Sequence, residues 1–301
     1  MREIRLNGIM PPLTTPFTGD GSLDLGALKA NVARYNETGL AGYVALGSNG
    51  EAVHLSSGER GQVIQAIAQS ATSEHTIIAG VNALSTRAAI EATREAAGSG
   101  AEAALVITPY FYKSSMTAPV LTRFYTEVAD QSPVPLLIYN VPQNTGVVIE
   151  PAAIAALAEH QNIVGVKDSS GNMAAISDTI RRTPSSFAVM TGNGGILYPS
   201  LVMGARGAVL GVACTAARAC VELYEAVKAN EHARARELQN RLAPLSHAVT
   251  AQFGVAGLKA AMDMTGLAGA ATRAPLTRIS DADRDKIRTV LRETGLFANL
   301  E

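Results

Sequence analysis

Short apolar runs alternate with longer amphipathic segments along most of this chain. The runs with the length and composition of buried strands cover residues 8–17, 42–46, 76–81, 103–108, 134–140, 163–167, 187–191 and 208–212. Segments in which apolar residues recur at helical spacing follow them, among them residues 24–38, 57–71, 85–98 and 117–130. This alternation is typical of βα units repeated around a parallel sheet.

Eight such units predict an α/β fold, a closed (β/α)8 TIM barrel over residues 1–215. Local helix signals agree with the division. Ser56 and Glu59 have the spacing of a capping box at a helix start, and Pro151 suits a first helical turn.

The rest of the chain, residues 216–301, predicts a C-terminal helical extension. Helical spacing recurs at residues 220–228, 232–249, 255–264 and 281–293. No long polar linker separates these segments from the barrel, so we expect them to pack on it as part of a single structural unit.

An open, doubly wound sheet is the main structural alternative, because it also alternates strands and helices. Such a fold would need a phosphate-binding loop, and the nearest candidate, Gly-Asn-Gly-Gly at 192–195, lacks the GxGxxG spacing and comes late in the chain. We therefore interpret residues 192–195 as a barrel loop.

Composition excludes several classes of partner. The formal net charge of the 301 residues is −1, and acidic and basic residues are interspersed, so no basic stripe predicts nucleic-acid binding. The longest apolar tract, 196–217, contains Arg206 and several glycines, and no membrane span is expected. Cys214 and Cys220 lack the spacing of a metal site, so neither a bound metal nor a disulfide is expected, and a reducing cytoplasm fits best.

Lys167 is the residue on which the predicted chemistry rests. It closes the apolar run 163–166 and precedes the polar stretch 168–171, so its amine should lie at the lip of a buried strand. Loss of water solvation there favours the neutral amine, which can attack a carbonyl to form a Schiff base. Position alone favours a lysine that leaves a strand for solvent, so the case for chemistry depends on the rest of the chain.

Other strand ends supply partners, because active sites of barrels lie at the carboxyl ends of the strands. Tyr139 could relay protons for a 2-oxo acid bound as an iminium on Lys167, and Ser48 and Asn49 could bind its carboxylate. Ser169, two residues after Lys167, would share its face and contact the distal end of the substrate. Each has a plainer interpretation, with Tyr139 as a core residue and Ser48 and Asn49 as turn formers.

Taken together, the motifs resemble a known family. They are Gly-Ser-Asn-Gly-Glu at 47–51, Thr-Pro-Tyr at 108–110, Tyr-Asn-Val-Pro at 139–142 with Thr-Gly at 145–146, and Gly-Val-Lys-Asp at 165–168. In this order they are similar to the dihydrodipicolinate synthase and N-acetylneuraminate lyase family of pyruvate-dependent class I aldolases. The resemblance covers nearly the whole chain.

The resemblance implies a role for each candidate residue. Lys167 would form the Schiff base, so no separate cofactor is needed, Tyr139 would be the proton-relaying phenol, and Ser48 and Asn49 would bind carboxylate. Gly192 and Leu210 would line the site. The family also implies a small 2-oxo acid substrate and a homotetramer built as a dimer of dimers.

Two departures from the synthase pattern guide the choice of reaction. Asn144 stands where dihydrodipicolinate synthases carry an arginine for the second carboxylate. Phe111, followed by Tyr112, stands where they place a tyrosine of a neighbouring subunit in the proton relay, and both aromatics could instead serve packing or an interface.

These departures weigh against a synthase. The combination of Gly-Ser-Asn-Gly-Glu, Val-Pro-x-Asn-Thr-Gly and Lys-Asp-Ser, with the tail segments 253–259 and 273–276, looks closer to 4-hydroxy-2-oxoglutarate aldolases. The leading hypothesis is therefore reversible cleavage of 4-hydroxy-2-oxoglutarate to pyruvate and glyoxylate by a class I lyase. The first alternative is 4-hydroxy-tetrahydrodipicolinate synthase, which condenses pyruvate with aspartate semialdehyde. The second is a protein that binds a 2-oxo acid without catalysis, because one fold hosts many functions.

Overall fold

The computed structural model describes residues 4–297, and within that range eight parallel strands form one sheet. The sheet order is β1-β8-β7-β6-β5-β4-β3-β2. The strands are β1 (Gly8–Met10), β2 (Gly42–Ala45), β3 (Thr76–Val81), β4 (Ala103–Ile107), β5 (Leu136–Asn140), β6 (Ile163–Asp168), β7 (Ala188–Thr191) and β8 (Gly207–Val209).

Backbone hydrogen bonds between the β1 and β2 segments bring the two ends of the sheet together. Ala41 N donates to Ile9 O at 3.0 Å, and Val44 N donates to Pro11 O at 3.0 Å. In return, Leu13 N donates to Val44 O at 2.9 Å. The predicted (β/α)8 barrel is therefore confirmed.

The first and last strands, β1 and β8, end well before the apolar runs that predicted them do. The run 8–17 gives a strand of only three residues, because Pro11 and Pro12 have no N–H to contribute to a ladder. The run 208–212 leaves the sheet after Val209, because the chain turns into a 3₁₀ helix, η5 (Gly211–Cys214).

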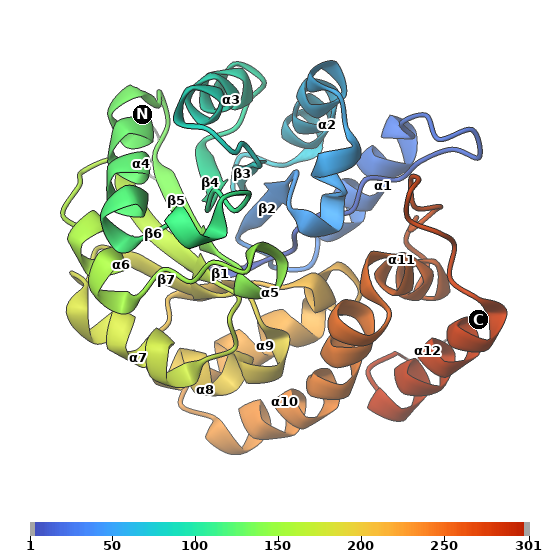
Figure 1. Ribbon diagram of the computed structural model, residues 1–301. Helices are drawn as coiled ribbons and strands as arrows, with labels where there is room; N and C mark the ends of the chain where they lie inside the picture. Colours follow the sequence, from blue (N-terminus) through green and yellow to red (C-terminus); the bar gives the residue numbers. More distant parts are fainter. Residues whose placement is uncertain (1–3, 298–301) are drawn as a thin grey trace.

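Helices surround the barrel on the outside (Figure 1). They are α1 (Leu25–Tyr35), α2 (Ser57–Ser70), α3 (Thr86–Gly98), α4 (Ala118–Gln131), α6 (Pro151–Leu157), α7 (Met173–Arg182), α8 (Leu197–Val202) and α9 (Ala217–Lys228), with the short α5 (Pro142–Thr145) between β5 and α6. The predicted start signals are present, because Ser56 and Glu59 form a reciprocal capping box on α2 and Pro151 opens α6.

The C-terminal part continues this ring. Helix α9 packs against α8 and β1, so the eighth helix of the barrel begins after residue 215. The extension then comprises α10 (His232–His247), the π-helical turn η6 (Ala248–Gln252), α11 (Gly254–Met264) and α12 (Asp281–Thr294). Helix α10 packs on α9, and α11 packs on α12, so the extension lies along one side of the barrel (Figure 1).

Strand alternation decides which side chains enter the barrel. On β5, Leu136 and Ile138 pack in the apolar layer between strands and helices, while Leu137 and Tyr139 belong to the cluster inside the barrel. On β6, Val166 packs in the outer layer. The next residue, Lys167, therefore points into the barrel at the carboxyl end of its strand.

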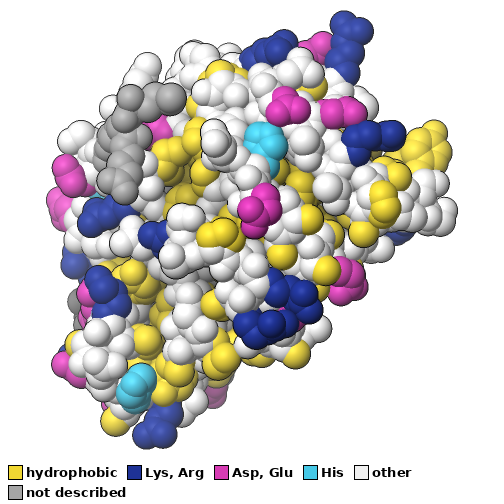
Figure 2. All heavy atoms as spheres, turned by 90° about the vertical axis from the view of Figure 1, so that its left-hand side faces the viewer, with side chains coloured by type: hydrophobic (Ala, Val, Ile, Leu, Met, Phe, Trp, Pro, Cys, Tyr) yellow, Lys and Arg dark blue, Asp and Glu magenta, His cyan; other side chains and the backbone are white. Residues whose placement is uncertain are grey.

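The face in Figure 2 carries basic and acidic side chains interspersed with apolar ones. Among residues 4–297, no helix is both long and apolar enough to cross a bilayer.

Candidate active site

Lys167 and Tyr139 are paired across neighbouring strands at the mouth of the barrel. They occupy the same register position of the β5–β6 ladder, and both are buried, with 4% and 5% of their surface exposed. Lys167 Nζ lies 4.3 Å from the centroid of the Tyr139 ring. The predicted amine and phenol are therefore brought together.

The environment of Tyr139 makes its phenol more acidic than usual. Burial alone would raise the pKa of the hydroxyl, but the charge of Lys167 and hydrogen bonds with Ser48, Lys167 and Ser169 outweigh it, so the pKa lies below the ordinary value of 10.0. A phenol with a lowered pKa passes a proton more readily at neutral pH than an ordinary tyrosine does.

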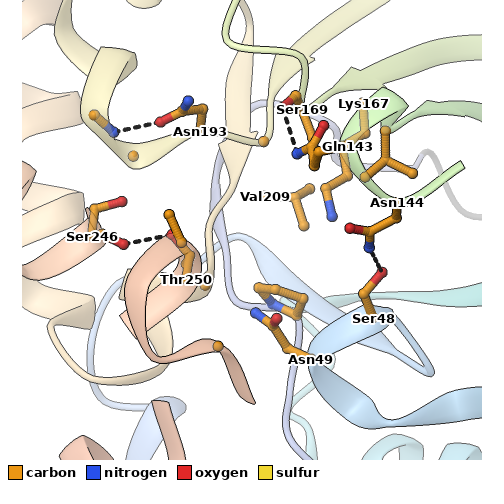
Figure 3. A pocket seen from close by; sticks show the side chains of 18 of the residues that line it. Ser48, Asn49, Gln143, Asn144, Lys167, Ser169, Asn193, Val209, Ser246 and Thr250 are labelled. Carbon is orange, nitrogen blue, oxygen red and sulfur yellow. Dashed lines mark hydrogen bonds between the residues drawn. The ribbon is translucent and has the colours of Figure 1, made fainter. Parts of the chain in front are cut away.

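Ser48 and Asn49 lie on a 3₁₀ turn, η1 (Ser48–Gly50), directly after β2. Ser48 Oγ is 3.4 Å from Tyr139 Oη, and Asn144 Nδ2 donates to Ser48 Oγ at 3.4 Å (Figure 3). The turn therefore places a hydroxyl beside the phenol.

Ser169 and Gly192 lie on the other side of Lys167. Ser169 N donates to Asn140 O at 2.8 Å, and Gln143 Nε2 donates to Ser169 O at 2.9 Å (Figure 3). A Cβ at position 192 would lie 1.9 Å from Ser169 Oγ and 3.1 Å from Lys167 Cε. Only glycine at 192 leaves room for both side chains.

These residues line a cavity of about 520 Å³. Lys167 points into it from the barrel side (Figure 3). Its full lining comprises Pro12, Ser48, Asn49, Tyr139, Val141, Gln143, Asn144, Lys167, Ser169, Gly192, Asn193, Gly194, Gly195, Val209, Gly211, Ala243, Ser246, His247, Thr250, Ala251, Gly254 and Val255. The two predicted catalytic residues and four of the five predicted substrate-binding residues line this cavity.

Leu210 is the exception. It is fully buried in the apolar layer between barrel and helices, while its neighbours Val209 and Gly211 line the cavity. The prediction that Leu210 lines the site is wrong, because Val209 at the end of β8 points into the barrel and the next side chain therefore points outward.

Phe111 and Tyr112 do not line the cavity. They lie on the β4–α4 loop with 72% and 70% of their surface exposed, and their rings make an edge-to-face contact with centroids 5.1 Å apart. Neither residue therefore reaches Tyr139 within the chain itself.

The C-terminal extension contributes residues that sequence reasoning missed. Ser246, at the end of α10, and Thr250, in the π-helical turn, line the cavity opposite Lys167, and Thr250 Oγ1 donates to Ser246 O at 2.6 Å (Figure 3). Asn193, which follows β7, joins them, and its Oδ1 accepts from Gly195 N. A π-helical turn often marks a functional site, but nothing in the residue pattern at 248–252 separates it from an ordinary helix.

A second missed feature is the pair that secures the ends of β5 and β6. Asn140 Nδ2 donates to Asp168 Oδ2 at 2.8 Å, and Asp168 Oδ1 accepts from Ser170 N at 2.8 Å. Asn140 Oδ1 also accepts from Ile149 N at 3.3 Å. The sequence contains a signal for this pair. Asn140 follows Tyr139 and Asp168 follows Lys167, so strands that pair Tyr139 with Lys167 also pair Asn140 with Asp168.

Comparison with known proteins identifies the family. The model of the dihydrodipicolinate synthetase family matches residues 5–294. The chain belongs to this family.

Relatives and solved structures agree with that assignment. The chain is 39% identical to a 4-hydroxy-tetrahydrodipicolinate synthase of Methanothrix thermoacetophila, over 94% of this chain and 95% of that protein. It is 35% identical to the enzyme of that name from Archaeoglobus fulgidus, over 97% and 99% of the two chains. The crystal structure of the chloride-inhibited dihydrodipicolinate synthase of Acinetobacter baumannii, complexed with pyruvate, has a TM-score of 0.92, with 34% identity and coverage of 97% and 100%.

These relatives correct the predicted reaction. Cleavage of 4-hydroxy-2-oxoglutarate was preferred because Asn144 replaces an arginine, yet the similar proteins are named as 4-hydroxy-tetrahydrodipicolinate synthases. That preference is wrong. The loss of one charged contact at position 144 is outweighed by similarity over nearly the full chain. The family is one of enzymes of the class I aldolase and lyase type.

Proposed function

We propose that this protein is a 4-hydroxy-tetrahydrodipicolinate synthase, which condenses pyruvate with aspartate semialdehyde. The observation that carries the proposal is the buried amine of Lys167 facing the ring of Tyr139, 4.3 Å away, at the bottom of a polar cavity. Full-length similarity to proteins of that name supports the choice of reaction.

The first step is formation of an imine. The neutral amine of Lys167 adds to C2 of pyruvate, and the carbinolamine loses its oxygen as water when a proton is delivered to it. Tyr139 lies next to the amine and has Ser48 Oγ 3.4 Å from its hydroxyl, so it can deliver and recover that proton. Ser48 and Asn49 would hold the substrate carboxylate on the η1 turn.

The second step forms the carbon–carbon bond. The iminium draws electrons from C3, which loses a proton to give an enamine, and C3 then attacks the aldehyde carbon of the second substrate. The aldehyde oxygen becomes an alkoxide and takes a proton through Tyr139. Attack on the new iminium by the acceptor's own amine, or by water, breaks the bond to Lys167 and restores the free enzyme.

The far side of the cavity would receive the acceptor. Asn193, Ser246 and Thr250 line it opposite Lys167 and offer neutral hydrogen-bonding groups. Ser169, two residues beyond Lys167, would contact the part of the acceptor closest to the new bond. Asn144, at the mouth, supplies an amide where the family's synthases supply a guanidinium, so recognition of the acceptor carboxylate would rest on neutral donors.

We also propose that the protein assembles as a homotetramer and works in the cytoplasm with no cofactor besides the lysine imine. The exposed aromatic pair Phe111 and Tyr112 supports an interface on the β4–α4 loop, because contiguous exposed aromatic surface is characteristic of subunit contacts. The third member of the proton relay would then be Tyr112 of a neighbouring subunit or a water molecule.

Reduction with borohydride in the presence of pyruvate tests the imine directly. Peptide mapping by mass spectrometry should find the reduced pyruvate adduct on Lys167, and an unmodified Lys167 would contradict the proposal. Consumption of pyruvate should then depend on added aspartate semialdehyde. An adduct on Lys167 without such condensation would keep the aldolase chemistry but overturn the choice of reaction.

A further inference from the structure

A buried ion pair lies directly beneath the turn that carries Ser48 and Asn49. Glu51 Oε1 and Lys259 Nζ are 2.6 Å apart, and only 1% of each side chain is exposed. The contact brings opposite charges together away from water. Glu51 ends the η1 turn, and its N–H donates to Ser48 O at 3.2 Å.

The backbone of Glu51 is held in an unusual conformation. Its φ of 54° and ψ of 33° lie in the left-handed region, which costs a residue with a Cβ roughly 1–2 kcal/mol. Such a conformation persists only where the surroundings determine it. The partners of the Glu51 carboxylate are therefore candidates for what keeps the turn in shape.

Lys259 connects that turn to two other segments. Its Nζ donates to Thr15 O at 2.8 Å and to Ala271 O at 2.7 Å. Thr15 in turn holds the η1 turn from below, because its Oγ1 donates to Gly50 O at 2.7 Å. One ammonium on α11 thus joins the β1–α1 loop, the β2–α2 loop and the segment after α11.

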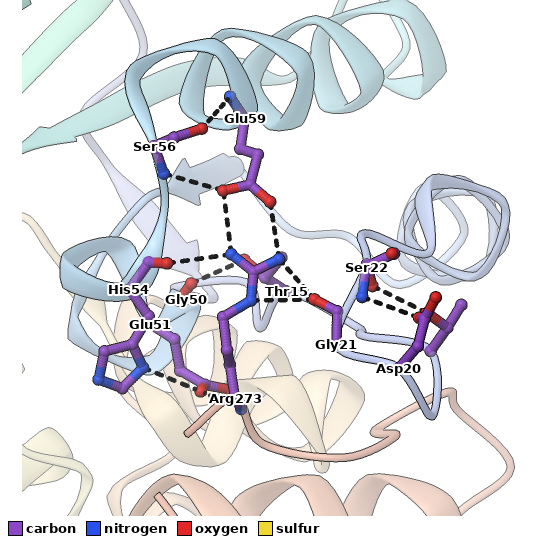
Figure 4. A network of polar contacts seen from close by, with 11 residues as sticks. Thr15, Asp20, Gly21, Ser22, Gly50, Glu51, His54, Ser56, Glu59 and Arg273 are labelled. Atoms are coloured by element: carbon purple, nitrogen blue, oxygen red, sulfur yellow. Dashed lines mark hydrogen bonds and ion pairs between the residues drawn. The ribbon is translucent and has the colours of Figure 1, made fainter. Parts of the chain in front are cut away.

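Arg273 secures the second oxygen of the same carboxylate (Figure 4). Its backbone N–H donates to Glu51 Oε2 at 2.9 Å, and its guanidinium donates to His54 O at 3.0 Å and to Gly21 O at 2.6 Å. The same guanidinium pairs with both oxygens of Glu59, at 2.7 and 3.0 Å. Both ends of the segment 51–59 are therefore attached to one residue of the C-terminal extension.

Stability alone does not account for this arrangement. Two charges removed from water lose solvation that their attraction roughly repays, and a well-packed apolar pair is often as stable or more stable. Burial lowers the pKa of Lys259, and Glu51 opposes that shift. A buried charge pair is better explained by the geometry that it imposes on the segments that it joins.

We propose that Glu51 is a positioning residue for the 2-oxo acid: with Lys259 and Arg273 it fixes the turn that presents Ser48 and Asn49 to the substrate carboxylate. The inference rests on the proposed function, because it takes that turn as the carboxylate site. Through Glu51, the C-terminal helices set the affinity of the barrel mouth for pyruvate. Neither Glu51 nor Lys259 itself lines the cavity.

The test uses two variants and a matched control in the full chain. Glu51→Gln removes the carboxylate charge and keeps the side-chain shape. The double variant Glu51→Gln with Lys259→Met replaces the pair by neutral groups, which avoids an uncompensated buried charge and retains the fold. Glu225→Gln removes a carboxylate from an exposed pair on α9, where Glu225 lies 3.8 Å from Lys228.

The first measurement is the pyruvate concentration that gives half-maximal borohydride-trapped adduct on Lys167. We expect both Glu51 variants to raise it about tenfold, a loss of about 1.4 kcal/mol in binding, with the maximal adduct unchanged because Lys167 is intact. Glu225→Gln should match the wild type. A purely structural role predicts wild-type half-saturation in the double variant once it is shown to be folded, and that result overturns the proposal.

The second measurement needs no substrate. Amide hydrogen exchange at residues 48–52 should be faster in both Glu51 variants than in the wild type and in Glu225→Gln, with the barrel strands unchanged. Unchanged exchange at 48–52 overturns the positioning role even if pyruvate is never trapped. Absence of trapping in the wild type refutes the proposed function instead, so the two failures are distinct.

Discussion

Lys167 and Tyr139 occupy the same register position on neighbouring strands, and the Lys167 amine lies 4.3 Å from the centre of the Tyr139 ring. Because both side chains are buried, water screens the charge of Lys167 only weakly at the Tyr139 hydroxyl. The amine supplies a positive charge that favours the phenolate, and the phenol supplies a proton donor beside the atom that must attack a ketone.

Replacing the amine should abolish turnover without unfolding the protein. Lys167→Met keeps a long, flexible side chain of similar volume in a buried position, so we expect a thermal unfolding midpoint at or above that of the wild type. Because no imine can form, kcat for pyruvate-dependent condensation should fall by on the order of 10³-fold or more. Steady-state kinetics and a thermal scan check this together, and retained turnover in a folded variant refutes the mechanism.

The same substitution should make Tyr139 less acidic. Burial would raise the pKa of the hydroxyl, and it is the charge and hydrogen bond of Lys167, helped by Ser48 and Ser169, that bring it below the ordinary value. Without Lys167, the phenolate should therefore appear at a higher pH than in the wild type. Phenolate absorbance measures this as the difference between each protein and its Tyr139→Phe counterpart. A midpoint that is unchanged or lower would contradict the electrostatic coupling.

An arginine at position 144 should improve use of an acceptor with a carboxylate. Asn144 is exposed at the mouth of the cavity, and its contact with Ser48 Oγ at 3.4 Å is weak. A guanidinium can pair with a carboxylate for roughly 1.5–3 kcal/mol, so Asn144→Arg should raise kcat/KM for aspartate semialdehyde about tenfold. Propanal, which has no carboxylate, serves as the control acceptor. An equal gain for both acceptors would show that charge is not the cause.

Pairing of Glu59 with Arg273 should make stability depend on pH in the acid range. Hydrogen bonds from the Arg273 side chain and the Ser56 backbone lower the pKa of Glu59 from 4.5 to about 2. A carboxyl group with a lowered pKa in the folded state contributes stability that is fully present above pH 4.5 and is lost as the pH falls toward about 2.

Glu59→Gln should therefore unfold at a lower temperature than the wild type at neutral pH, by about 2 °C for a loss of about 1 kcal/mol, because the pair is partly solvent-exposed. The two proteins should converge as the pH approaches 2. Calorimetry across this range checks the convergence, with Glu225→Gln as the exposed control. A constant difference at every pH would mean that the ion pair is not the source.

Sequence periodicity predicted the parts of the site that depend on local pattern. The carboxyl ends of β5 and β6 must be adjacent in a barrel, so Tyr139 and Lys167 could be paired before any coordinates. Leu210 shows the limit, because the apolar run 208–212 does not by itself show which of its residues faces into the barrel; Val209 does, so Leu210 at the next position points outward.

The contribution of the tail could not be predicted in the same way. Ser246 and Thr250 reach the cavity only because α10 packs along α9 and the chain then makes a π-helical turn. Lys259 and Glu51 are far apart in sequence, and an isolated lysine in an amphipathic helix gives no sign that its partner lies on a barrel loop. Long-range packing, not local propensity, determines both contacts.

Subunit assembly should depend on the aromatic pair of the β4–α4 loop. Phe111 and Tyr112 expose 72% and 70% of their surface, and burying two such rings in a contact would remove a large apolar area from water. Phe111→Asp would place a charge in that contact and leave an unpaired carboxylate in it, so we expect dissociation into smaller species by sedimentation velocity. Val202→Asp on α8, where the parent valine is 49% exposed, is the control and should sediment as the wild type does. If Phe111→Asp also sediments as the wild type, this loop is not an interface, and a third relay group cannot come from Tyr112 of a neighbouring subunit.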